Sequence, residues 1–169
     1  GINTNFSNTG NSLEVPASYP QQGFPALDYL INGVASNDTL IIDLQDVGTR
    51  VYTYISTLSL IMEKCAGRDI KLVVLDRPNP VGGEMIEGTI LQPGYESFVG
   101  RYPIPQRHSM TLGEVGMFGK NVLKTDCNLD VVKMTNWKRN MYWEETGLPW
   151  VLPSPNLPTA VGALTFVGT

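Results

Sequence analysis

Two short apolar runs flank a segment of helical periodicity, and this pattern constrains the fold more than any other feature. Thr39–Asp43 and Lys71–Leu75 are each long enough for a buried strand. Between them, apolar side chains recur at helical spacing from Tyr54 to Ala66, and Gly67 follows as a stop signal. A strand, a helix and a strand within about forty residues predict a right-handed βαβ unit with parallel strands.

Further along the chain, the pattern predicts one more helix and one more strand. Thr111 and Glu114 fit the capping box of a helix that we expect to run to Leu123. Leu129–Met134 reads as a third strand. Val81–Arg107 is rich in Gly and Pro, so it is either a functional loop or contains short strands. The sequence therefore predicts an α/β fold with a mostly parallel sheet and long Gly/Pro-rich loops.

The two ends of the chain carry weaker signals. Residues 1–38 are predicted to be irregular, except that Ala26–Gly33 can form two helical turns. Residues 136–169 are expected to be mostly loop, with a strand at Ala163–Val167. The segment between them, 39–135, carries the predicted α/β domain.

Composition excludes several classes of function. The chain has 12 Lys and Arg against 16 Asp and Glu, for a net charge of −4, and no basic stripe, which argues against nucleic-acid binding. No apolar run is long enough to span a membrane, and Gly1 does not open a signal peptide. The phosphate-binding Gly motifs and the spacings of zinc ligands are absent, so we expect no nucleotide, metal or other cofactor. The two cysteines are expected to be buried free thiols.

Polar side chains follow both strands of the βαβ unit. Ligands of open α/β sheets bind outside the carboxyl ends of the strands, so these side chains should share one cleft. Carboxylates beside guanidinium, amide and phenol groups suit a polyol, and paired carboxyl groups catalyse glycoside cleavage. The alternative is that the same charges form structural ion pairs that pin the loops. The residues are Asp43, Asp46, Arg50 and Tyr52 after the first strand, and Asp76, Arg77 and Asn79 after the second.

Three residues outside these strand ends are further candidates. Glu87 lies in an extended stretch after a Gly-Gly turn, where it faces either the cleft or solvent. His108 is the only histidine and stands at a loop-to-helix junction, where a proton carrier, a ligand contact and a structural role are all open. Trp150 is the tryptophan considered for the cleft, although packing is the more common use of Trp.

A series of ordered motifs resembles the NamZ-type exo-β-N-acetylmuramidases, a bacterial family of glycoside hydrolases. The likeness extends over roughly Thr39 to Thr169, and the number of motifs in the same order makes it far more specific than any one of them. The motifs are Asp43–Arg50, Tyr52–Leu58, Val74–Pro80, Gly82-Gly83, Glu87-Gly88, Glu96–Pro105, Arg107-His108, Met110–Glu114, Thr146–Trp150 and Pro153–Asn156.

The resemblance implies a fold and an activity. Residues 39–135 would form part of a Rossmann-like catalytic domain, a three-layer sandwich present here only in part. Residues 136–169 would lead toward an auxiliary domain, with the active site in the cleft between the two, whereas residues 1–38 match poorly. The implied reaction releases N-acetylmuramic acid from the non-reducing end of peptidoglycan fragments without a cofactor. The resemblance also implies an extracytoplasmic location, periplasmic or secreted.

The residues and the resemblance together assign roles. Catalysis is assigned to Asp46, Asp43 and Glu87. Substrate binding is assigned to Arg50, Tyr52, Asp76, Arg77, Asn79, Arg101, His108 and Asn156. Under the resemblance, the lactyl carboxylate of the sugar would be held by Arg50, Arg77, Arg101 or His108, since Arg suits bidentate contacts with carboxylates.

The chain also departs from the family. Its members carry an Asn-Gln-Thr-Gly segment and a Gly-Pro-Glu-His-Gly segment whose glutamate is implied as a catalytic acid, and this sequence contains neither. We therefore expect a fragment that lacks a catalytic carboxyl group when alone. The alternative function is a non-catalytic module that binds peptidoglycan or another carbohydrate. An α/β oxidoreductase or transferase is disfavoured by the missing phosphate loop.

Overall fold

The computed structural model describes residues 6–8, 11–13 and 31–168. In the first two segments, β1 (Phe6–Asn8) and β2 (Asn11–Leu13) pair antiparallel. Most of the N-terminal segment for which irregular structure was predicted, including most of the predicted helix at Ala26–Gly33, lies outside the described residues.

Three parallel strands form the main sheet. They are β3 (Thr39–Ile42), β4 (Lys71–Leu75) and β5 (Asn128–Val132), in the order β3-β4-β5. The predicted βαβ unit is confirmed, since α2 (Tyr54–Cys65) connects β3 to β4. All three strands therefore end at the same edge of the sheet, and β4 is central.

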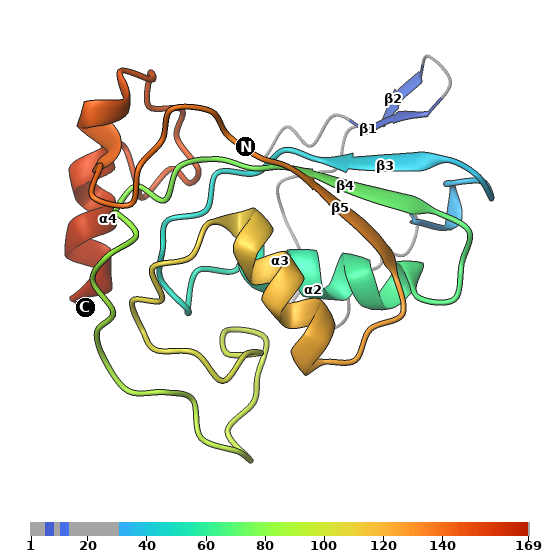
Figure 1. Ribbon diagram of the computed structural model, residues 1–169, viewed down its shortest axis with the longest axis horizontal. Coiled ribbons are helices and arrows are strands. Elements are labelled where there is room, and N and C mark those ends of the chain that lie inside the picture. The colour runs from blue at the N-terminus through green and yellow to red at the C-terminus, as the bar shows by residue number, and fades with distance from the viewer. Residues whose placement is uncertain (1–5, 9–10, 14–30, 169) are drawn as a thin grey trace.

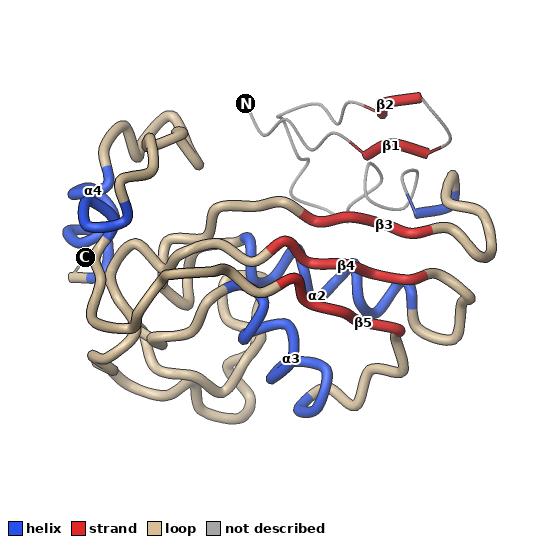
Figure 2. The backbone as a smooth tube through the Cα atoms, turned by 45° about the horizontal axis from the view of Figure 1, so that its top comes forward, coloured by secondary structure: helices blue, strands red, loops and turns tan. Residues whose placement is uncertain are grey.

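One face of the sheet carries both long helices. Figures 1 and 2 show α2 and α3 (Leu112–Val122) side by side beneath the strands. The opposite face is more open: Ile41 and Val132 are 46% and 52% exposed. The described residues thus supply a sheet and one helical layer of the expected partial sandwich. The core between them includes Leu40, Ile42, Ile55, Leu58, Ile61, Met62, Leu72, Val74, Leu112 and Val115, and the buried free thiols of Cys65 and Cys127 belong to the same cluster.

The start of α3 follows the prediction. The Thr111 hydroxyl accepts a hydrogen bond from the Glu114 backbone N–H at 3.3 Å, and the Glu114 carboxylate accepts one from the Thr111 N–H at 3.0 Å. This reciprocal pair satisfies two of the donors that a helix N-terminus leaves free. The direction of α3 away from the strand ends is therefore fixed locally.

The long Gly/Pro-rich connection contains no helix and no strand beyond isolated bridges, all of it within the described residues. It is held at its end by Arg107, whose guanidinium donates to the Glu87 carboxylate at 2.6 Å and to the Val81 carbonyl. Backbone bridges join Arg107 to Thr49 and to Glu87. The loop thus returns to the carboxyl edge of the sheet before α3 begins.

The strand predicted at Ala163–Val167 is wrong, because this segment is helical. A 3₁₀ turn at Trp143–Thr146 is followed by α4 (Ala160–Val167), which the Thr159 side chain caps by accepting from the Gly162 N–H at 3.3 Å. Only one face of α4 is buried, but its exposed face is also apolar, so the sequence showed no helical periodicity. Within the described segments, no helix is both long enough and apolar enough to cross a membrane.

A second, small core holds the C-terminal segment against the carboxyl edge of the sheet. Val47 and Val81, which follow β3 and β4, are fully buried against Leu157 and Ala163. The Tyr54 hydroxyl, at the start of α2, also donates to the Pro153 carbonyl at 2.6 Å. Figure 1 shows α4 beyond the strand ends, on the side where the loops gather.

Gly48 is needed where these loops meet. Its φ is +77°, in the left-handed region, and a Cβ atom there would lie 2.3 Å from Asn79 Oδ1 and 2.5 Å from Val81 Cγ2. Gly67 also has a positive φ, +68°, but a Cβ atom there would meet nothing within 4 Å. An alanine at Gly67 would therefore add backbone strain alone, whereas an alanine at Gly48 would add both strain and steric overlap.

We expect Gly48→Ala to lower the free energy of unfolding by about 2–5 kcal/mol, the sum of left-handed strain and steric overlap. Gly67→Ala, the matched control, should cost about 1–2 kcal/mol, because only the strain applies. Urea unfolding of both variants and the wild type measures the difference. Equal losses would show that the Gly48 contact with Asn79 is not tight.

Candidate functional site

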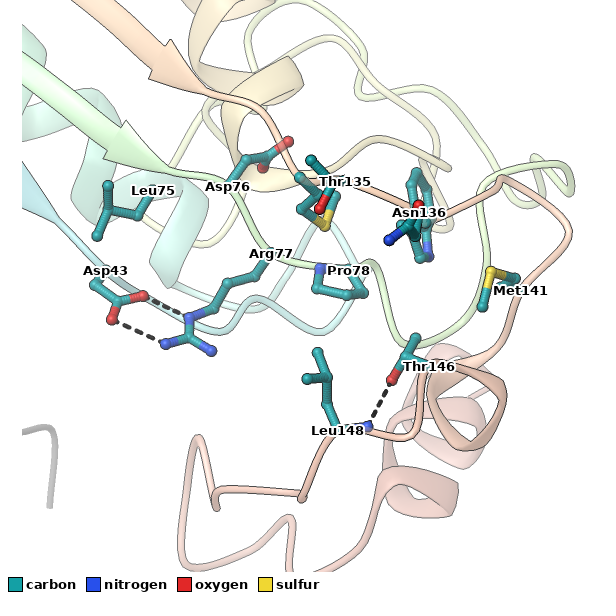
Figure 3. A pocket seen from close by; sticks show the side chains of 12 residues that line it. Asp43, Leu75, Asp76, Arg77, Pro78, Thr135, Asn136, Met141, Thr146 and Leu148 are labelled. Atoms are coloured by element: carbon teal, nitrogen blue, oxygen red, sulfur yellow. Dashed lines mark hydrogen bonds and ion pairs between the residues drawn. The ribbon is translucent and has the colours of Figure 1, made fainter.

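A pocket of about 470 Å³ lies at the carboxyl edge of the sheet, where the sequence placed the cleft. We call it the first pocket. It has the size of small-molecule sites, which span about 300–1,000 Å³. It is lined by Asp43, Leu75, Asp76, Arg77, Pro78, Met134, Thr135, Asn136, Trp137, Met141, Thr146 and Leu148, most of which Figure 3 labels.

A bidentate ion pair forms one wall of the first pocket. Arg77 Nε and Nη2 donate to the two carboxylate oxygens of Asp43 at 2.5 and 2.8 Å (Figure 3). Asp43 thereby raises the pKa of Arg77. Both side chains are nearly half exposed, so the pair adds little to stability. The main effect of the ion pair is on geometry, because it fixes the orientation of the Arg77 guanidinium at the pocket wall.

Asp76, the other predicted acid in the first pocket, directly follows β4 and is hydrogen-bonded to the start of α3. Its two carboxylate oxygens accept hydrogen bonds from the Thr111 hydroxyl and the Gly113 N–H, each at 2.8 Å. Burial raises the pKa of Asp76 although both hydrogen bonds oppose the shift. A Cβ atom on Gly113 would lie 2.9 Å from the Asp76 Cγ, so only glycine allows this approach.

Asp46 and His108 meet behind this edge rather than in the pocket. The side chains are 7% and 0% exposed, and His108 Nε2 lies 3.7 Å from Asp46 Oδ2. The Gly48 N–H donates to Asp46 at 2.9 Å, and the Met110 N–H donates to His108 Nδ1 at 3.2 Å. His108 Nε2 must then carry the proton of the neutral ring. Burial raises the pKa of Asp46 to about 7 and lowers the pKa of His108 to about 4.

The predicted cations Arg50 and Arg101 are engaged outside the first pocket. Arg50 donates to the Thr89 and Ile104 carbonyls, both at 2.6 Å, and so holds the long loop. Arg101 donates to the Ser59 hydroxyl at 2.8 Å and pairs with the Glu63 carboxylate on α2. Glu87, predicted as catalytic, forms an ion pair with Arg107.

The remaining predicted residues also lie outside the pocket lining. Asn79 is buried; its amide donates to the Met110 carbonyl at 2.9 Å, and its oxygen accepts from the Val81 N–H at 3.1 Å. Tyr52 packs edge-on against Phe166 of α4, with ring centroids 6.1 Å apart. Asn156 is exposed in the C-terminal loop.

Trp150 packs instead of lining the pocket. Its indole N–H donates to the Leu157 carbonyl at 3.0 Å, and its ring meets Trp143 edge-on with centroids 5.0 Å apart. The tryptophan in the pocket lining is Trp137.

Sequence reasoning missed the residues that follow β5. Met134, Thr135, Asn136 and Trp137 all line the first pocket. The signal was available, because a third parallel strand had been predicted and its carboxyl end belongs to the same edge of the sheet.

The sequence comparisons agree with this architecture. Residues 11–161 match the family described as "Exo-beta-N-acetylmuramidase NamZ, N-terminal". The chain belongs to this family. The match covers most of the chain, and it includes every strand of the main sheet and both helices that cover it.

Individual relatives give the same result. The chain is 52% identical over 132 residues to the "Peptidoglycan beta-N-acetylmuramidase NamZ" of Bacillus subtilis (strain 168), covering 78% of this chain and 32% of the relative. Two crystal structures of DUF1343 family proteins from Bacteroides fragilis also match. The first has a TM-score of 0.73 at 44% identity, covering 76% of this chain and 34% of that one. The second has a TM-score of 0.67 at 36% identity, covering 77% of this chain and 36% of that one. The chain thus spans about a third of the length of these relatives.

The Asp46–His108 pair makes a testable statement about stability and pH. Between pH 4 and 6.5 the folded pair holds its proton on Asp46, whereas the unfolded chain, with ordinary pKa values of 3.8 and 6.5, holds it on His108. The proton count is the same in both states. The pair therefore adds almost no slope to the pH dependence of the wild type in this window.

Single variants should expose opposite slopes. In Asp46→Asn, the unfolded state alone binds the His108 proton, so the free energy of unfolding should rise from pH 4 to 6.5. In His108→Gln, the folded state alone binds the Asp46 proton, so the free energy of unfolding should fall from pH 4 to 7. Each slope should approach about 1.4 kcal/mol per pH unit, the value for one proton. Urea unfolding across this range measures both, and parallel slopes in the two variants would contradict the assignment.

Proposed function

We propose that the protein containing this chain hydrolyses the glycosidic bond that joins a terminal N-acetylmuramic acid to a peptidoglycan fragment. Membership of the family supports this activity, as does the printed name of the Bacillus relative. The observation that carries the proposal is the first pocket, which brings a carboxylate, a guanidinium and an indole together at the ends of three parallel strands. The substrate is part of the cell wall, so we propose that the protein acts outside the cytoplasm.

The reaction needs two functional groups. The bond between the anomeric carbon and the leaving oxygen breaks; water supplies a hydroxyl to the carbon and a proton to the oxygen. One carboxyl group protonates the leaving oxygen, and a second activates water or attacks the carbon. In the first pocket we assign Asp43 to one of these roles, because it is exposed to the pocket and held in place by Arg77.

Asp76 suits a positioning role better than a catalytic one. The donors to its two oxygens both belong to the start of α3, so it orients the helix and the wall of the pocket. The Asp43 carboxylate also accepts two hydrogen bonds, but both come from Arg77 in the pocket lining, and its side chain is 46% exposed. Asp46 and Glu87 line neither this pocket nor its neighbour. We therefore expect the second carboxyl group of the reaction to come from outside the described residues.

Arg77 is the best candidate for the lactyl carboxylate of the sugar. Of the four cations considered from the sequence, it alone lines the first pocket. Asp43 engages its Nε and Nη2 atoms, and Nη1 has no hydrogen-bond partner among the described residues. A carboxylate on Nη1 would receive a charge-assisted hydrogen bond next to the existing ion pair.

A non-catalytic peptidoglycan-binding module is the second candidate, and the structural engagement of Asp76 favours it. An assay separates the two. The full-length protein is incubated with para-nitrophenyl N-acetylmuramide, and release of nitrophenol is followed. Turnover supports the hydrolase, whereas saturable binding without turnover supports the module and contradicts the proposed activity.

We expect Arg77→Ala to weaken binding of N-acetylmuramic acid by about 10–100-fold, the value of a hydrogen bond between charged groups. Binding of N-acetylglucosamine, which lacks the lactyl group, should change much less. Calorimetric titration of the full-length protein with both sugars measures the effect.

Arg101→Ala is the matched control, because its guanidinium is engaged by Ser59 and Glu63 on α2. It should leave both affinities near their wild-type values. If Arg101→Ala loses N-acetylmuramic acid selectively and Arg77→Ala does not, the carboxylate site lies at Arg101 instead.

A further inference from the structure

A second pocket adjoins the first. Its volume is about 480 Å³, and it lies between the start of α3 and the end of β5. Asp76, Met134 and Trp137 line both pockets, so these three side chains form a shared wall. The carboxyl edge of the sheet therefore offers two adjoining compartments of nearly equal size.

The two compartments differ in their chemistry. Arg77 and Asp43 line only the first, whereas Glu114 and Lys133 line only the second. Lys133 is exposed and has no ion pair among the described residues, so its ammonium group is available to a ligand. The second pocket thus combines the free donor of Lys133 with apolar surface, without the bidentate guanidinium edge of the first. The Glu114 carboxylate in its wall already accepts from the Thr111 N–H and from Arg139.

The shared wall is held in place from behind. An atom added as Cβ on Gly83 would lie 3.0 Å from Trp137 Cη2, so the indole edge packs closely against the backbone there. The Arg139 guanidinium lies 6.0 Å from the Trp137 ring centroid, within the range of a cation–π contact. Arg139 itself donates to the Ser109 carbonyl at 3.1 Å and pairs with Glu114. These contacts therefore fix the orientation of the Trp137 indole ring.

We propose that the two pockets hold two consecutive sugars of one glycan end, with Trp137 as the aromatic wall between them. The inference rests on the proposed function and extends it to the leaving-group side. The first pocket takes the muramoyl sugar, because Arg77 matches its carboxylate. The second takes the N-acetylglucosamine that follows it, whose hydroxyl and acetamido oxygens can accept hydrogen bonds from the Lys133 ammonium group. A rigid indole offers its apolar surface to the carbon-bound hydrogens of both rings.

The test compares two substrates that share the muramoyl group. One is the disaccharide of N-acetylmuramic acid linked to N-acetylglucosamine. The other is para-nitrophenyl N-acetylmuramide, whose leaving group lacks the hydroxyl and acetamido groups of a sugar. The full-length protein is assayed as wild type, Lys133→Ala and Lys138→Ala. Lys138 is the matched control, an exposed lysine of the same loop that lines neither pocket.

Lys133→Ala should lower kcat/KM for the disaccharide about tenfold or more, as expected for a lost charged hydrogen bond. It should leave kcat/KM for the nitrophenyl substrate within about twofold, and Lys138→Ala should change neither. Equal losses on both substrates, or no loss on the disaccharide, would overturn the second sugar site while the hydrolase stands. A wild type that cleaves neither substrate contradicts the proposed function, and this inference with it.

Trp137 supplies an independent readout. Trp137→Ala should lower kcat/KM for both substrates, and Trp137→Phe should restore most of it, because a phenyl ring keeps an aromatic wall. Unfolding curves of both variants show whether the fold is intact. If folded Trp137→Ala retains wild-type activity on both substrates, the wall has no part in binding.

Discussion

The double hydrogen bond to Asp76 is the interaction on which the candidate site depends. Asp76 follows the central strand, and its carboxylate receives the Thr111 hydroxyl and the Gly113 N–H of α3. This contact sets where α3 begins, and with it the space between α3 and the end of β5. Because Asp76 also lines both pockets, one carboxylate links the fold to the site.

Much of the fold could be predicted because its signals are local. The buried runs of β3 and β4, the apolar face of α2 and the capping box of α3 each follow from short-range patterns, and the structure confirms all of them. The helix α4 was missed for a related reason. Its exposed Val161 and Leu164 erase the polar face that would have marked a helix, so the apolar run resembled a strand.

The site was harder to predict, because the sequence shows which residues follow a strand but not which way they point. Asp43 and Asp46 stand three residues apart, yet Asp43 lines the first pocket and Asp46 is buried against His108. Arg50 and Arg77 both follow strands, yet Arg50 serves the long loop. These outcomes depend on long-range partners such as the Ile104 carbonyl, which no spacing rule reveals. Trp137 follows β5 and lines the pocket, but its position in the sequence does not distinguish it from a tryptophan that packs in a core, the more common use of Trp.

Several of the predicted polar residues thus stabilise the loops at the carboxyl edge of the sheet, and only a few other side chains there are open to a ligand. Asn79 connects the start of the long loop to Met110, and Gly48 fits against Asn79. The groups left to a ligand include the Asp43–Arg77 pair, Lys133 and the wall formed by Trp137. This division explains how many family motifs can be structural while the chemistry rests on few side chains.

A crystal structure of the full-length protein with bound N-acetylmuramic acid tests the central claim most directly. The account predicts the sugar at the carboxyl ends of β3 and β4, with its carboxylate on Arg77 and its ring beside Trp137. A sugar bound away from this edge, for instance at Arg101 on α2, would contradict it.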